Sequence, residues 1–132
     1  LVGHTTTGTL NAAEDNTGIG IDALDALTSG DNNTAVGSGA GSAVASGSLN
    51  SFVGSFCGNI ATGDSNTGVG YSTQAYLSSG TANTAVGGTS SVQNATGSWN
   101  TSLGHSALEG VSSNNHSYNT ALGSRSNYYW RI

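Results

Sequence analysis

A five-residue pattern, Asn-Thr-x-Val-Gly, recurs along this chain at an almost fixed interval and limits the fold more than any other feature. Its seven complete copies begin at Asn16, Asn33, Asn50, Asn66, Asn83, Asn100 and Asn119, and Val2-Gly3 is a shortened copy. Successive residues of the Val column are 17, 17, 17, 16, 17, 17 and 19 positions apart. A repeat this short cannot bury an apolar face alone, so each copy is expected to be one coil of a stacked solenoid.

Each coil, counted from its Asn, carries fixed kinds of residue at fixed positions. Position 4 is Val, Ile or Leu, position 5 is Gly, and position 3 is Gly, Ala or Ser with Phe52 as the exception. A second apolar column near position 12 comprises Leu10, Leu27, Val44, Leu77, Val111 and Trp130. Short alternating segments bounded by turn residues are typical of strands. We therefore predict an all-β fold, a parallel β-roll or β-solenoid of about eight coils with two short strands per coil.

Two columns are predicted to hold the coils together. The position-4 column is predicted to form the core, and it comprises Val2, Ile19, Val36, Val53, Val69, Val86, Leu103 and Leu122. The Asn column that opens the coils is predicted to form a structural ladder, because Asn favours turns and stacked amides can bond from coil to coil. The coils are expected to start near residues 1, 16, 33, 50, 66, 83, 100 and 119.

The composition argues against several classes of protein. The net charge is −5, and Arg125 and Arg131 are the only Lys or Arg residues, which argues against a nucleic-acid partner. No apolar run approaches the ~20 residues of a membrane span, so no membrane insertion by this segment is expected. A chain that begins without Met inside a coil is expected to be part of something longer.

Catalytic and metal-binding patterns are not found. His4 and His105 share a column but lie six coils apart, about 29 Å along the rod, so they cannot bind one metal ion within a single chain. The acidic residues show no recurrent paired spacing of the kind that glycoside hydrolysis requires. Cys57 stands among small residues and is predicted to be a buried small hydrophobe. We expect no enzyme, no metal and no cofactor.

The repeat resembles the head repeats of trimeric autotransporter (YadA-like) adhesins, and residues 30–37, Gly-Asp-Asn-Asn-Thr-Ala-Val-Gly, match that motif closely. It is also similar to the β-solenoid repeats of bacteriophage tail fibres. The long 17-residue coil and the ending at residues 126–132, which resembles the approach to a C-terminal chaperone domain, favour the tail fibre. The resemblance implies a left-handed, homotrimeric β-solenoid over residues 1–123, with residues 124–132 as an end cap or a transition to a following domain.

The resemblance also implies a function. The first expectation is an extracellular, non-catalytic segment of a virion tail fibre that supports attachment to a host receptor, either a glycan or a protein. The alternative is the head of an adhesin on a bacterial surface. A further alternative is an ice-binding solenoid, because the Thr column at position 2 resembles the Thr ranks of some antifreeze proteins. Since Trp and Tyr make good anchors, the candidate receptor or trimer contacts are Trp99, Tyr118, Tyr71, Tyr76, Tyr128 and Tyr129.

Overall fold

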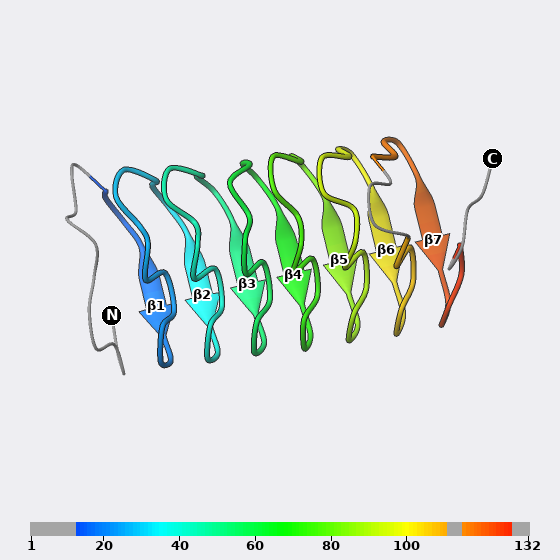
Figure 1. Ribbon diagram of the computed structural model, residues 1–132, viewed down its shortest axis with the longest axis horizontal. Coiled ribbons are helices and arrows are strands. Elements are labelled where there is room, and N and C mark those ends of the chain that lie inside the picture. Colours follow the sequence, from blue (N-terminus) through cyan, green and yellow to red (C-terminus); the bar gives the residue numbers. More distant parts are fainter. Residues whose placement is uncertain (1–12, 111–114, 128–132) are drawn as a thin grey trace.

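The computed structural model describes residues 13–110 and 115–127, and these residues form a rod of stacked coils (Figure 1). One strand of each coil contributes to a single parallel sheet in which the strands follow chain order. The strands are β1 (Thr17–Ile19), β2 (Thr34–Val36), β3 (Ser51–Val53), β4 (Thr67–Val69), β5 (Thr84–Val86), β6 (Thr101–Leu103) and β7 (Thr120–Leu122). The seven strands correspond to about six turns of a solenoid. The prediction of an all-β, parallel β-solenoid is confirmed.

The register of the sheet does not change where the length of the coil does. Val53 pairs with Val69 across the coil of 16 residues, and Leu103 pairs with Leu122 across the coil of 19 residues. The missing and the additional residues are therefore accommodated outside the strands.

The return leg, which we define as positions 6–12 of each coil, is not a second strand in the described residues, although a second strand was predicted. Positions 7 and 9 have positive φ in each coil, for example 55° at Phe56 and 58° at Gly58. Left-handed residues at alternate positions interrupt an extended strand. Backbone hydrogen bonds still join successive return legs, and the N–H of Gly41 donates to the carbonyl oxygen of Cys57 at 2.9 Å.

The position-4 column lies on the outside of the coil, so the prediction that it forms the core is wrong. Its members in β1–β7 are exposed or half-buried, and Ile19, Val53, Val69, Leu103 and Leu122 are 44%, 41%, 39%, 48% and 73% exposed. Val36 and Val86 are half-buried, and Val2 lies outside the described residues. The inward residues of the strands are those of position 3, such as Ala35 and Ala85, which are fully buried. Alternation along a strand creates two faces, and the narrow interior of a coil this short accepts the smaller side chains.

The rest of the interior comes from positions 8, 9 and 12. Leu27, Val44 and Leu77 of the position-12 column are buried, whereas Leu10, Val111 and Trp130 lie outside the described residues. Phe52 is the one bulky side chain at position 3 among the strands β1–β7, and glycines surround it. A Cβ atom added to Gly58 would lie 2.5 Å from carbons of its ring, and one added to Gly68 would lie 3.2 Å away. A ring fits at this point because its neighbours have no side chain.

The predicted Asn ladder is present. Oδ1 of Asn50 accepts hydrogen bonds from the backbone N–H and from Nδ2 of Asn66, at 2.9 and 3.2 Å. Nδ2 of Asn66 also donates to the carbonyl oxygen of Gly80 at 2.9 Å. The same pattern links Asn16, Asn33, Asn50, Asn66, Asn83, Asn100 and Asn119. Each Asn from Asn33 to Asn100 thus joins its own turn to the coils before and after it.

Candidate functional site

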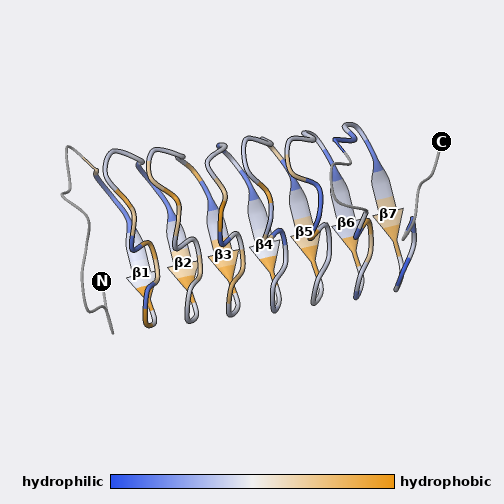
Figure 2. Cartoon of the chain, viewed as in Figure 1, coloured by the Kyte–Doolittle hydropathy of each residue, from blue (hydrophilic) through white to orange (hydrophobic). Residues whose placement is uncertain are grey.

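Two long surfaces of the rod could contact a partner, and the first is the sheet face, which we define as the outward side of β1–β7. Positions 2 and 4 of each coil lie on it, so it carries a rank of Thr or Ser beside a rank of branched aliphatic residues. Figure 2 shows the apolar ends of the strands aligned in one band along the rod. The sheet face is thus a flat, ordered surface with one polar and one apolar rank.

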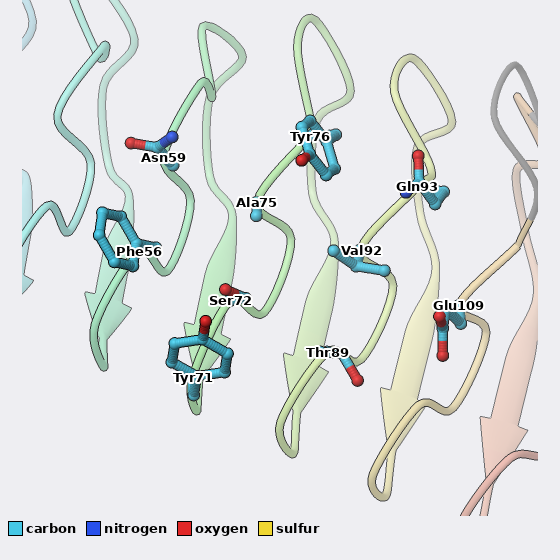
Figure 3. A pocket seen from close by; sticks show the side chains of 10 residues that line it. All are labelled: Phe56, Asn59, Tyr71, Ser72, Ala75, Tyr76, Thr89, Val92, Gln93 and Glu109. Carbon is cyan, nitrogen blue, oxygen red and sulfur yellow. The ribbon is translucent and has the colours of Figure 1, made fainter.

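The second surface is a groove of about 440 Å³ on the outside of the return legs, which we call the return-leg groove (Figure 3). It extends over the coils of β3–β6 and is lined by Phe56, Asn59, Tyr71, Ser72, Ala75, Tyr76, Thr89, Val92, Gln93 and Glu109. Ala75 and Val92, both at position 10, lie between Tyr71 on one side and Tyr76 and Gln93 on the other (Figure 3). The groove therefore has a small apolar floor between taller side chains.

The aromatic lining of the groove is a local feature of the coils of β3 and β4. In the preceding coil the positions that correspond to Phe56, Asn59 and Ile60 hold Gly39, Ser42 and Ala43. The ring of Phe56 lies over Gly39, since a Cβ atom there would be 2.8 Å from the ring.

One polar atom in the wall of the groove has no partner among the described residues. Oε2 of Glu109 is buried, and nothing in the described part of the chain donates to it. At the opposite end, Oδ1 of Asn59 already accepts a hydrogen bond from Oγ of Ser42. The groove thus combines exposed aromatic rings with a carboxylate that has remaining acceptor capacity.

A third set of exposed apolar side chains immediately precedes the Asn of three coils. Leu49, Trp99 and Tyr118 are 60%, 60% and 81% exposed, each with a φ of 62°. Trp99 and Tyr118 come from adjacent coils, and the N–H of Tyr118 donates to the carbonyl oxygen of Ser98 at 3.0 Å. Their role as receptor or trimer contacts stays a prediction.

The remaining predicted site residues fall in different places. Tyr71 and Tyr76 are exposed and share the return-leg groove, whereas Tyr128 and Tyr129 lie outside the described residues. Phe56, Gln93 and Glu109 belong to the groove although no sequence pattern singled them out. A signal was available, because Phe56 and Tyr71 are one coil apart at neighbouring positions of the repeat.

The chemistry of the titratable groups is limited. Burial raises the pKa of the Cys57 thiol to about 12, while a backbone hydrogen bond at Val53 lowers it slightly. A thiol that stays protonated is a poor nucleophile, and Cys57 is buried as predicted. Within residues 13–110 and 115–127, no three His, Cys, Asp or Glu side chains are placed to hold a metal ion. No helix in this part of the chain could cross a membrane.

The chain matches no model of a known protein family, no curated protein and no solved structure. Its function must therefore be argued from the sheet face and the return-leg groove.

Proposed function

We propose that this chain is a non-catalytic segment of a homotrimeric fibre outside the cell, of the bacteriophage tail-fibre type, that supports attachment to a host. The observation that carries the proposal is the apolar rank of the sheet face. Branched aliphatic side chains stand outward at every strand from β1 to β7, and their register is unbroken. Exposed apolar side chains that occur singly need no explanation, whereas a contiguous row of them indicates an interaction surface.

A second copy of the same chain is the partner that fits this row best. Six spacings of about 4.8 Å give the row a length of ~29 Å, and any other copy carries the same row with the same spacing. Three copies that turn these rows toward one axis can bury them together, in head-to-tail contacts that close into a ring under three-fold symmetry. Burying the exposed half of one Val gains on the order of 1 kcal/mol, so only the whole row offsets the ~4–15 kcal/mol entropic cost of association.

The function would be mechanical. A trimer of rods, with the three sheet faces turned toward one axis, would leave the three return legs facing solvent. Holding three weak receptor sites together raises their effective concentration, so that attachment outlasts any single contact.

Sedimentation equilibrium of the purified chain tests the proposal. We expect a mass of 39 kDa, three times the 13.0 kDa of one chain. Val69→Lys, on the sheet face, should shift the mass toward that of the monomer without unfolding the coil. Ile21→Lys is the matched control, because Ile21 is 59% exposed on the return leg, and it should leave the mass unchanged. A folded monomer of the unaltered chain would overturn the proposal.

Ice binding is the second candidate, and the outward Thr rank favours it. Thr34 pairs with Ser51 and Thr67 pairs with Thr84, so the hydroxyl groups repeat on one flat face at the spacing of the strands. In a trimer joined through the sheet face these groups would be covered. Thermal hysteresis together with a monomeric mass would establish ice binding in place of the fibre, and a trimer without hysteresis would exclude it.

A further inference from the structure

We propose that the return-leg groove binds a short, neutral oligosaccharide that lies along the axis of the rod. The proposal depends on the fibre function for its biological setting only, because the groove and the sheet face belong to different legs of the coil. Its volume of about 440 Å³ lies within the ~300–1,000 Å³ that is usual for small-molecule sites.

The first reason is the exposure of three aromatic rings around one small floor. Phe56, Tyr71 and Tyr76 are 46%, 61% and 53% exposed, so they are not part of the interior of the coil. Ala75 and Val92 between them are short enough to leave the groove open (Figure 3). Rings of this kind present flat apolar faces to the C–H face of a sugar, and the phenolic hydroxyls add hydrogen-bonding groups at the rim.

The second reason is the polar chemistry at the two ends of the floor. Glu109 supplies a buried carboxylate oxygen without a partner among the described residues, and Gln93 and Asn59 supply side-chain amides. The carboxylate of Glu109 accepts hydrogen bonds, and the side-chain amides of Gln93 and Asn59 can donate them, which suits the hydroxyl groups of a sugar. A sugar has hydroxyl groups of this kind on every ring.

The third reason is the charge of the groove. Glu109 is the only Asp, Glu, Lys, Arg or His among the ten lining residues. The whole chain carries seven acidic residues, two arginines and no lysine. A sulfated, phosphorylated or carboxylated sugar would meet no cation there and would be repelled by the carboxylate. The groove therefore disfavours anionic sugars, and the ligand that we propose is neutral.

A peptide fits the groove less well than a sugar. Peptides that add to a β-structure need free backbone donors and acceptors at its edge. In the return legs these groups are already bonded from coil to coil. The N–H of Tyr76 donates to the carbonyl oxygen of Val92 at 3.1 Å, and the N–H of Gln93 donates to that of Glu109 at 3.0 Å. The groove therefore offers a ligand side chains and no free backbone groups in the return legs named here. It extends over three coil spacings, or ~14 Å.

Saturation-transfer NMR on the full chain tests the proposal with five probes. Maltotriose, cellotriose, chitotriose and mannotriose are the neutral probes, and a heparin tetrasaccharide is the anionic one. We expect transfer to at least one neutral trisaccharide and none to the heparin fragment. Tyr71→Ala should weaken the binding roughly tenfold, the equivalent of one aromatic contact, while Tyr71→Phe should retain most of it. Ile21→Ala changes a side chain of similar exposure at the same position of the first coil and should have no effect.

Circular dichroism of each variant checks that the coil is intact, and Tyr76→Ala provides a second removal of a ring if Tyr71→Ala fails to fold. The proposal is overturned if none of the four neutral trisaccharides binds, if only the heparin fragment binds, or if Ile21→Ala weakens binding as much as Tyr71→Ala. A folded trimer that binds none of the trisaccharides would refute the proposed sugar site and leave the fibre proposal standing. A monomer that binds one of them would refute the fibre proposal and support the sugar site.

Discussion

The coils of β1–β3 and those of β4–β6 share one backbone but have different interiors. We call residues 13–61 the apolar half and residues 66–110 the polar half. The apolar half buries Ala23, Leu24, Leu27, Ala35, Ala40, Val44, Phe52, Cys57 and Ala61. The polar half contributes Leu77 to that cluster and buries, among others, Thr73, Gln74, Ser90, Ser91, Asn94, Ser102 and Ser106. The register of the sheet passes through the boundary between β3 and β4 without a change.

The framework of the solenoid does not depend on what fills it. The Asn ladder and the backbone bonds between coils are the same in both halves. The polar filling has a cost, because both amide atoms of Gln74 and Oδ1 of Asn94 are buried without a partner among the described residues. Both residues belong to the polar half. We therefore expect the apolar half to be more stable.

Phe52→Ala should have the largest effect. Phe52 is fully buried and fills space that Gly58 and Gly68 leave open, so its removal creates a cavity that the backbone cannot close. The expected loss in the free energy of unfolding is about 3–5 kcal/mol. Ser102→Ala, at the same position of a coil in the polar half, removes one hydrogen bond from Ser90 and should cost about 1 kcal/mol. Urea unfolding followed by circular dichroism measures both. Equal losses would show that the two interiors contribute equally to the free energy of unfolding.

The Asn ladder should be equally important in both halves. Asn33→Ala leaves the N–H of Asn50 and the carbonyl oxygen of Gly47 without partners, and Asn83→Ala does the same to Asn100 and Gly97. Two orphaned groups should cost roughly 2–4 kcal/mol in each variant. The same unfolding experiment checks this, and Asn119→Ala at the end of the ladder should cost less. If the two variants lost clearly different free energies of unfolding, the ladder would depend on what fills the coil.

The sequence predicted the repeat, the register and the ladder because each depends on a residue type at a fixed interval. Asn and Gly have special backbone and amide properties, so their columns could be interpreted without knowledge of the rest of the fold. The inward face of the strand could not be predicted in this way. Alternation places Thr and Val on one face, and only the narrowness of the coil determines that the smaller residues lie inside. Phe52 argues for the wrong face, because its large side chain suggests that position 3 points outward. Its ring fits inside only because glycines of the return leg and of the next coil leave room for it.

The return leg and its groove were harder to predict than the strand. The left-handed positions there are occupied by residues such as Leu24, Phe56 and Thr89 as well as by glycine, so their backbone angles leave little trace in the sequence. The lining residues of the groove come from positions 6, 7, 10 and 11 of successive coils. They become neighbours only when the coils are stacked in the observed register, which is why Glu109 and Gln93 were missed.

Gln74→Leu should stabilise the polar half. Both amide atoms of Gln74 are buried without a partner among the described residues, and Leu24 occupies the equivalent position in the first coil with nearly the same φ, 54° against 53°. Removing the unsatisfied amide should raise the free energy of unfolding by about 1–2 kcal/mol. The change should appear as a higher urea midpoint with an unchanged slope. Gln93→Leu, on the outside of the return leg, is the control and should change the midpoint little. A lower midpoint for Gln74→Leu would mean that the amide has a partner.

The effect that is smallest near neutral pH concerns the pH dependence of the apolar half, through Cys57. Burial raises the pKa of its thiol from 9.0 to about 12, so between these values the folded chain keeps a proton that the unfolded chain releases. The free energy of unfolding should therefore be unaffected by Cys57 below pH 9, and above it should fall by at most ~1.4 kcal/mol per pH unit. Because other groups also titrate there, the measurement is the difference between the unaltered chain and Cys57→Ala in urea unfolding across this range.

A cysteine thiol placed in each half allows the two interiors to be compared directly. Ser90 occupies the position of Cys57 in the polar half, where Oγ of Ser102 and the carbonyl oxygen of Ala107 lie within hydrogen-bonding distance. A thiol introduced by Ser90→Cys in a Cys57→Ala background would have a hydroxyl group nearby that can donate to the thiolate. A hydrogen bond to the charged form opposes the effect of burial on the pKa. The decline in stability above pH 9 should then end at a lower pH and reach a smaller total loss than for Cys57. Equal total losses would mean that the hydroxyl groups of the polar half do not make its interior a more favourable environment for charge.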